Sequence, residues 1–387
     1  MDGRKKTDEK MDALKEELKY TIALMDIRGV GSVRARLLID TFGSAKAAYE
    51  ANDHALLSIP RIGRAIVEQR ADDTHLQRAE RELDFADQHH IKVLLYGHEG
   101  YPSRLLDCPD APTLLFYLGE ANLESRHIIS IVGTRKATQY GRDCVAALVK
   151  ELGAALPDLV VVSGLALGID VSAHRASLDA KVKTVGVVAH GLDRVYPANH
   201  RNIARMMIAE GGGMCTEYLT GTDIERGNFL ARNRIIAGLA DATIVAESRD
   251  RGGSLITASI ALDYNRDVFA FPGRTTDDRS SGCNRLIRLN RAGLITCADD
   301  LLDAMNWRDA ASRKLPLQPS IDFGDEGLSP IARSVLDLLQ QKGDLRLGQL
   351  CNLLPDTTRA ALIEEMLQLE INGKVCACPG GVYRRRT

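Results

Sequence analysis

The sequence of 387 residues lacks the long apolar runs that mark membrane and secreted proteins. No stretch is apolar over the length needed to cross a bilayer, and the first 20 residues are charged throughout, unlike the apolar core of a signal peptide. We therefore expect a cytoplasmic protein with no membrane partner. The formal net charge of −2 gives no general attraction to nucleic acids, so any such binding needs a local basic pocket.

Cysteine pairs and cofactor motifs are also missing. The eight cysteines are scattered without a CxxC pair or the histidine spacing of a zinc site, so we expect them to be reduced and structural. Asp170 and His174 lie one helical turn apart and could form part of a metal site, but no third ligand has a fixed spacing, and a helix cap at Asp170 is the simpler interpretation. No GxGxxG follows the strand at 128 and no GxxxxGK[ST] occurs, which removes the usual support for a dinucleotide cofactor or ATP hydrolysis. We predict neither a metal nor a cofactor.

What the sequence does contain is a regular alternation of strand-like runs and helical patterns from Ile91 to Phe271. This alternation predicts an α/β fold, an extended Rossmann-like parallel sheet with helices on both faces and ligands at the carboxyl ends of its strands. The expected strands cover 91–97, 113–119, 128–132, 159–163, 184–189, 214–217, 242–246 and 268–271, and the expected helices cover 141–152, 170–178, 200–209, 232–239 and 256–265.

The strand at 128–132 ends in Gly133-Thr134-Arg135-Lys136, shortly before an expected helix. Such a turn presents backbone N–H groups, a glycine that permits close approach and two cationic side chains, which together favour a bound phosphate. Two other glycine turns, Ser163-Gly164 and Gly253-Ser254, follow strands of the same alternation and should meet it at one rim of the sheet.

The segment from Phe229 to Gly238 places an aromatic residue beside two arginines. Phe229 is either a surface on which a base stacks or a core residue, and its place beside Arg232 and Arg234 in a chain with 5% aromatic residues favours stacking. In a helix interior the two arginines would point to different sides, whereas at a helix N-terminus both can reach the rim.

The regions on either side of this central domain, which we place at 86–305, have a different character. Residues 1–20 predict a solvated tail or a frayed helix, and 21–85 predict a helical domain with turns at Gly29-Val30-Gly31 and Gly63. That domain resembles a helix-hairpin-helix (SAM-like) pair, in which hairpin amides hold a phosphate, or it is a small bundle whose glycines only make turns.

The C-terminal region begins with a polar, proline-containing stretch, 306–328, which predicts a linker. Residues 329–387 show three helical patterns and a short hairpin, and resemble a winged helix. From Asp325 to Thr387 eight basic residues stand against eight acidic ones, and the candidate recognition helix carries Glu364, Glu365 and Glu370 against Arg359. This balance disfavours a sequence-specific reader of double-stranded DNA and favours a partner-binding or regulatory module.

Seven segments follow, in order and spacing, the pattern of the DprA/Smf DNA-processing family: VGTRKATQYG, SGLALGIDVSAH, GLDRVYPANH, TEYLTG, FLARNRIIAGLADATIVAES, GGSLITASIAL and VFAFPG with GCNRLI. The resemblance covers about Ile91 to Thr296. It implies a homodimer, not an enzyme, that binds and protects single-stranded DNA and delivers it to the recombinase RecA in natural transformation. The expected DNA-binding residues are Gly133, Thr134, Arg135, Lys136, Ser163, Gly164, Phe229, Arg232, Asn233, Arg234, Gly253, Ser254 and Thr257.

Two alternatives stay open at this level. A rival function is that of the phosphoribohydrolases once taken for lysine decarboxylases, whose glycine-rich turn carries a glutamate needed for glycosidic cleavage; the turn RGGSLITASI lacks it, although Glu217 or Glu247 could substitute. The dimer contact is expected at Leu286 and Ile287, which could equally be ordinary core.

Overall fold

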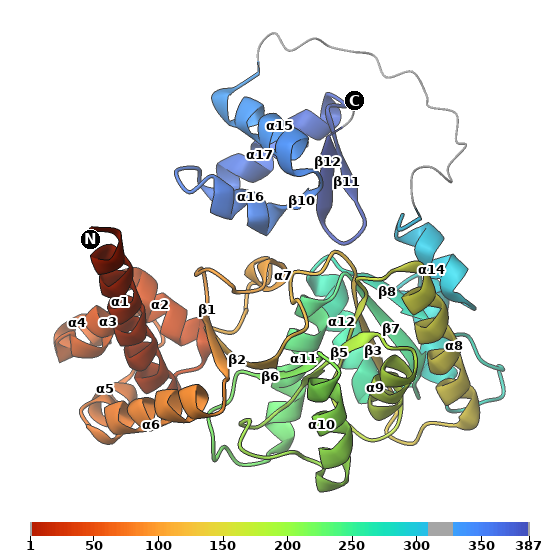
Figure 1. The fold of residues 1–387 in the computed structure, drawn as a ribbon, viewed down its shortest axis with the longest axis horizontal. Coiled ribbons are helices and arrows are strands. Elements are labelled where there is room, and N and C mark those ends of the chain that lie inside the picture. Colours follow the sequence, from red (N-terminus) through yellow and green to blue (C-terminus); the bar gives the residue numbers. More distant parts are fainter. Residues whose placement is uncertain (1, 309–327, 386–387) are drawn as a thin grey trace.

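The computed structural model describes residues 2–308 and 328–385 of the chain. A helical N-terminal domain, a central domain built on a large sheet and a small C-terminal domain follow one another, and the C-terminal domain lies over the central one (Figure 1). The part of the expected linker from 309 to 327 lies outside the described residues. Within the described ranges, no helix is both long and apolar enough to span a membrane.

The N-terminal domain packs against the edge of the central sheet. Its core joins Ile22, Ile27 and Leu38 to Leu114 and Phe116 of the adjoining sheet strand. Most of the segment expected as a tail or frayed helix is helical, because α1 begins at residue 2. The helices are α1 (Asp2–Asp26), α2 (Ser32–Phe42), α3 (Ala45–Glu50), α4 (Asp53–Leu57), α5 (Arg64–Arg70) and α6 (Thr74–Gln88).

The central sheet has nine strands in the order β1-β2-β6-β5-β4-β3-β7-β8-β9. The pairs β1–β2 and β2–β6 are antiparallel, and the other six pairs are parallel. The predicted α/β, Rossmann-like class is therefore confirmed. The strands are β1 (Lys92–Leu95), β2 (Leu114–Gly119), β3 (Ile128–Gly133), β4 (Val160–Ser163), β5 (Lys183–Val187), β6 (Gly213–Thr216), β7 (Ala242–Glu247), β8 (Asp267–Ala270) and β9 (Gly293–Leu294).

Helices cover both faces of the parallel part, which explains why β3 is an apolar run rather than an alternating one. Ile128 and Val132 pack toward one helical layer, and Ile129 and Ile131 toward the other. The first layer is α7 (Ser103–Leu106), α11 (Arg226–Leu239), α12 (Gly253–Asp263) and α13 (Ser281–Arg288). The second is α8 (Gln139–Ala155), α9 (Ile169–Asp179), α10 (Arg201–Ala209), which a short 3₁₀ turn η1 (Ala198–His200) precedes, and α14 (Ala298–Ala304).

The C-terminal domain consists of three helices and a three-stranded sheet in the order β10-β12-β11. Its apolar core is separate from that of the central domain. The elements are α15 (Pro330–Lys342), β10 (Leu345–Arg346), α16 (Leu347–Leu353), α17 (Arg359–Ile371), β11 (Val375–Cys378) and β12 (Val382–Arg385).

This domain is docked on the amino ends of the parallel strands. Asp241, just before β7, accepts hydrogen bonds from Arg104 of α7 at 2.8 and 2.9 Å and from Arg346 of β10 at 2.6 Å. Burial alone would raise the pKa of Asp241, but the two guanidiniums outweigh it and lower the pKa. The tip of the β11–β12 hairpin points at the central domain (Figure 1), where the Gly380 carbonyl accepts a hydrogen bond from Arg266 at 3.2 Å. The amino edge of the sheet is thus covered, and its carboxyl edge stays open.

Candidate nucleic-acid interface

A pocket of about 510 Å³ lies at the carboxyl edge of the sheet. Its walls are the turn after β3, one side of α11, the loop after β7 and the first turns of α12. We call it the arginine pocket. Its lining residues are Val132, Gly133, Thr134, Arg135, Ala166, Asp170, Arg226, Phe229, Leu230, Arg232, Asn233, Ile236, Arg249, Arg251, Gly252, Gly253, Ser254 and Thr257.

The turn after β3 is held from two sides. The Thr134 N–H donates to the Glu247 carbonyl at 2.8 Å, and the Thr134 carbonyl accepts from the Ile169 N–H at 3.1 Å. A Cβ at Gly133 would come within 2.5 Å of the Ile169 side chain and 2.9 Å of the Glu247 carbonyl, so only glycine fits there. The turn is therefore rigid where it presents Arg135 to the pocket.

Phe229 forms an aromatic surface on the opposite wall. The Arg135 guanidinium lies 5.7 Å from the centre of its ring, within cation–π distance. The ring of Tyr196 lies 5.9 Å from it on another side. Phe229 is half-buried and is absent from the apolar clusters among the described residues, so the structure places it at the pocket rather than in the core.

Arg232 is the buried cation of the pocket, 3% exposed. It donates to the Val187 carbonyl at 2.6 Å, and a Cβ at Gly164 would lie 2.0 Å from its Nη1 and 2.6 Å from an Asp170 oxygen, so glycine makes room for both groups. Burial lowers the pKa of Arg232, and the neighbouring Asp170 partly offsets this effect. Burial likewise raises the pKa of Asp170, against the influence of Arg232. The contact between Arg232 and Asp170 places the Arg232 guanidinium at the floor of the pocket.

Three arginines of the pocket were not predicted from the sequence: Arg226, Arg249 and Arg251. Arg226 starts α11, and the other two stand before the glycines that lead into α12. With Arg135 and Arg232, five arginines and the single carboxylate of Asp170 line the pocket, and Arg249 is also paired with Asp278 at 3.2 Å, which leaves an excess of three positive charges (5 − 2). The α12 N-terminus adds backbone N–H groups, which also favour an anion.

Nine of the thirteen predicted residues line the pocket, and four do not. Arg234 points away from the pocket. Because α11 begins at Arg226, Arg232 and Arg234 both lie in the middle of the helix, where residues two positions apart face different sides. Arg234 pairs with the buried Glu217 instead. Ser163 is fully buried and donates to the Ile131 carbonyl at 2.6 Å, and Gly164 lies behind Arg232. Lys136 is exposed beyond the turn.

The Asp170 and His174 pair is not arranged as a metal site. His174 is fully buried, its Nδ1 lies 2.7 Å from the Thr184 hydroxyl, and burial lowers its pKa to about 3. Among the described residues, no group of three or more His, Cys, Asp and Glu side chains is placed to hold a metal ion.

The residues expected at a dimer contact lie at the end of α13. Leu286 is 8% exposed and belongs to the central core, and Ile287 is half-buried against it. The exposed apolar side chains of the same surface are Ile256 and Leu289, at 44% and 51%. They line a second hollow that shares Arg251 and Gly252 with the arginine pocket.

Comparison with known proteins identifies relatives of this chain. The family model for DNA recombination-mediator protein A matches residues 92–306. Protein Smf of Synechocystis is 32% identical over 407 aligned residues, which cover 96% of this chain and 99% of that protein. DNA processing protein DprA of Streptococcus pneumoniae is 41% identical over 202 residues, which cover 52% of this chain and 70% of that protein.

Two solved structures are also similar. DNA processing protein A from Streptococcus pneumoniae superposes with a TM-score of 0.63 at 33% identity and covers 74% of this chain and 97% of its own. The Helicobacter pylori protein, in a structure that concerns its single-stranded DNA binding mode, gives a TM-score of 0.50 at 28% identity and covers 57% of this chain and 98% of its own. Because the family model matches more than half of the chain and a relative aligns along nearly all of it, the chain belongs to the DprA/Smf DNA-processing family.

Proposed function

We propose that this protein binds single-stranded DNA in the arginine pocket, protects it and loads RecA onto it during natural transformation in the cytoplasm. The observation that carries the proposal is the pairing of five arginines with one aromatic surface in a pocket of about 510 Å³. Arginine guanidiniums and the N–H groups of α12 match phosphate oxygens, and Phe229 offers a face to a base. Single strands present both groups together, whereas a duplex stacks its bases inside.

The Helicobacter pylori relative supports the choice of a single strand, because its structure concerns that binding mode. Loading of RecA is the part of the proposal that rests on family membership alone. It is tested separately, by whether the protein accelerates RecA assembly on a coated single strand.

The rival hydrolase function needs a carboxylate that faces a bound nucleotide. Glu217 is paired with Arg234 and the Ser32 hydroxyl, outside the pocket lining. Glu247 is fully buried, and its Oε2 accepts from the Thr138 N–H at 2.8 Å, beneath the turn after β3. Both candidates have structural partners, so we favour binding over cleavage. Release of free base from a nucleoside monophosphate would reverse this choice.

We also propose a homodimer whose contact lies around Leu286 and Ile287, through the exposed Ile256 and Leu289 beside them. Because this surface adjoins the arginine pocket, two copies would bring two pockets near each other. One strand could then occupy both, which raises the effective concentration for the second contact.

The test is the affinity for a labelled single-stranded oligonucleotide, compared with the same sequence as a duplex. Arg135→Ala should weaken single-strand binding by about 1.5–3 kcal/mol, because it removes a charge-assisted phosphate contact. Affinity should also fall steeply as salt rises.

Arg175→Ala is the matched control, since Arg175 is exposed on α9 and lies outside the pocket. It should bind like the unmodified protein. An Arg135→Ala variant that is folded and binds with unchanged affinity would remove the pocket from the function, and equal affinity for the duplex would remove the preference for single strands.

A further inference from the structure

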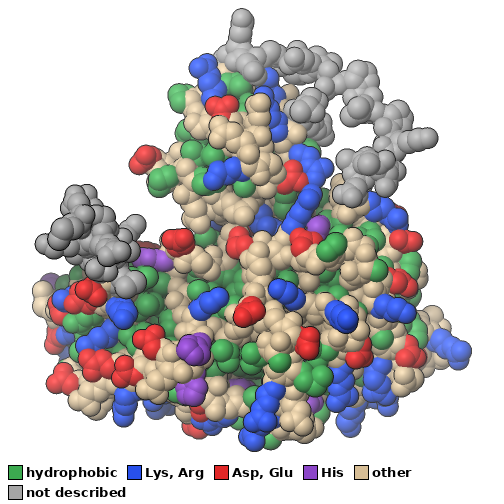
Figure 2. Space-filling view, viewed as in Figure 1, with side chains coloured by type: hydrophobic (Ala, Val, Ile, Leu, Met, Phe, Trp, Pro, Cys, Tyr) green, Lys and Arg blue, Asp and Glu red, His purple; other side chains and the backbone are tan. Residues whose placement is uncertain are grey.

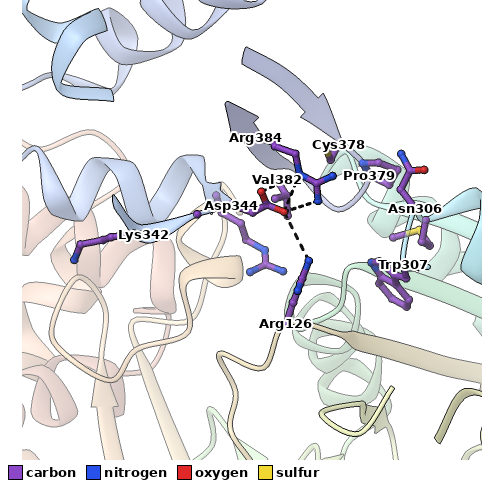
Figure 3. Close-up of a pocket in the computed structure, with 12 residues that line it drawn as sticks. Arg126, Asn306, Trp307, Lys342, Asp344, Cys378, Pro379, Val382 and Arg384 are labelled. Atoms are coloured by element: carbon purple, nitrogen blue, oxygen red, sulfur yellow. Dashed lines mark hydrogen bonds and ion pairs between the residues drawn. The ribbon is translucent and has the colours of Figure 1, made fainter. Parts of the chain in front are cut away.

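A second cavity, of about 460 Å³, opens at the seam between the central and C-terminal domains (Figure 3). We call it the seam cavity. Arg126 and the segment from Met305 to Trp307 line it from the central domain, and Lys342, Asp344 and Arg384 are among the residues that line it from the C-terminal domain. It lies at the opposite end of the sheet from the arginine pocket, because Arg126 precedes β3 and Gly133 ends it. Six strand residues separate the two ends by about 20 Å.

Positive charge at this seam exceeds the negative charge available to neutralise it. Each of two carboxylates is shared by an arginine from each domain: Asp241 by Arg104 and Arg346, and Asp344 by Arg126 and Arg384. Among the residues that line the cavity, four cations, Arg126, Lys342, Arg346 and Arg384, stand against the single carboxylate of Asp344, and Asp241 behind the lining neutralises Arg346. An anion in the cavity would therefore reduce the repulsion between these cations.

Arg126 is the cation of the cavity that is best placed to contact a ligand, because the Lys342 side chain at the edge of the cavity points away from Arg126 and Trp307 (Figure 3). Asp344 is engaged by Arg384 at 2.6 and 2.9 Å, and Arg126 reaches it only at 3.9 Å, with 70% of the Arg126 side chain exposed (Figure 3). Lys342 is exposed, and no ion pair joins it to another described residue. Because Lys342 ends α15, the carbonyls of that helix offset part of its charge. Arg126 thus supplies most of the free positive charge.

Trp307, the single tryptophan of the chain, forms part of the cavity wall. Its ring packs at 70° against His127, with the ring centres 4.9 Å apart, and His127 is held in turn by Asp158 at 2.6 Å. The indole is half-buried, so it is fixed in place and still contributes surface to the cavity. An aromatic wall beside a free cation is the combination that binds a base and its phosphate together.

We propose that the seam cavity binds a nucleotide, whose phosphate contacts Arg126 and whose base lies against Trp307. The nucleotide is either free or one unit of a single strand, since the recognising chemistry is the same. Because the cavity joins two domains, the bound nucleotide bridges them and stabilises the docked arrangement by mass action. This site is independent of the proposed function of the arginine pocket.

Trp307 supplies a specific readout, because its fluorescence reports on this cavity alone. The full-length protein is titrated with thymidine monophosphate and, in a second arm, with a short oligothymidylate. Both arms use excitation at 295 nm. We expect saturable quenching, and loss of roughly tenfold or more in affinity for Arg126→Ala. Quenching by the oligonucleotide alone would identify a strand as the ligand, and quenching by both would identify the nucleotide unit.

Three variants test whether the quenching arises from binding in the seam cavity. Arg135→Ala should keep the quenching, since it alters only the arginine pocket, and Arg333→Ala, exposed on α15, is the matched surface control. Asp344→Asn should tighten binding several-fold, because it removes the carboxylate that competes with the phosphate. Absence of saturable quenching, quenching that survives loss of Arg126, or quenching that disappears in Arg135→Ala would each overturn the proposal.

Discussion

At the scale of single residues, Arg232 and Arg234 show how two identical side chains, two positions apart, acquire different roles. Arg232 faces the arginine pocket beside Asp170, and Arg234 faces the N-terminal domain through Glu217 and Ser32. Arg232 is buried and Arg234 is partly buried, so both affect stability, but only Arg232 lines the pocket and can meet a ligand there. Their difference is set by the 100° that separates successive residues on a helix.

This difference predicts opposite outcomes for matched substitutions. Arg232→Met should weaken single-strand binding roughly tenfold or more, because the pocket loses its buried cation. Arg234→Met should leave affinity unchanged and lower the free energy of unfolding by about 3 kcal/mol, because Glu217 stays buried without its partner. Anisotropy titrations and thermal melts of both variants check this. Equal loss of binding in the two would show that helix stability, rather than pocket charge, controls affinity.

At the scale of elements, the surface formed by α12 and α13 is where a second copy is proposed to bind. It exposes Ile256 and Leu289 next to Arg285, while Leu286 belongs to the core beneath. Arg285, Leu286 and Leu289 lie in one short amphipathic segment and Ile256 lies in the preceding helix, but the sequence does not say which of these apolar residues the rest of the fold covers.

Leu289→Arg should therefore give a folded monomer, because it places a charge in the proposed apolar contact. The monomer should bind a short oligonucleotide normally and lose avidity for one long enough to reach two pockets. Light scattering and titrations with both lengths check it. Met206→Arg is the control, since Met206 is 54% exposed on the distant α10. If Leu289→Arg stays dimeric, the contact lies elsewhere.

At the scale of the whole molecule, the net charge is close to zero, so the binding of an anion depends on local groups of basic side chains. Basic and acidic side chains are interspersed over the face shown in Figure 2, in keeping with a net charge of −2. Two local groups of cations lie at the two ends of the central sheet, in the arginine pocket and at the seam. The C-terminal domain is likewise joined to the central domain by polar contacts rather than by a shared apolar core, since its own core is separate.

Arg346→Met should consequently loosen the C-terminal domain without unfolding the rest. Asp241 keeps Arg104 as a partner, while the docked arrangement loses roughly 1–3 kcal/mol. Small-angle scattering should show a larger radius of gyration, and single-strand affinity should persist because the arginine pocket is at the other edge. Arg333→Met is the matched control. An unchanged radius would show that the other contacts hold the domain, among them the Arg266 hydrogen bond to the Gly380 carbonyl and the Arg359 hydrogen bond to the Leu106 carbonyl at 3.0 Å.

The sequence by itself determined the alternation of strands and helices, because hydrophobic periodicity is a local property of the chain. Eight predicted strands correspond to β1 through β8, and the turn after β3 has the glycine that its close contacts require. The start of α11 was missed because Gly227 and Asn228 are weak helix formers, and tertiary packing overrode that preference.

Only the tertiary structure decided which polar residues meet. Arg226 reaches the pocket from the start of α11, Arg249 and Arg251 reach it from the loop after β7, and Arg346 reaches Asp241 across 105 positions of the sequence. The ion pair between Arg346 and Asp241 docks the C-terminal domain on the central one, and the polar composition of 306–328 gives no sign of this contact. Periodicity records which face of an element is covered, but it carries no signal for what covers it. Which residues meet at a site depends on the order of the strands in the sheet and on where each helix begins, and only the complete fold sets both.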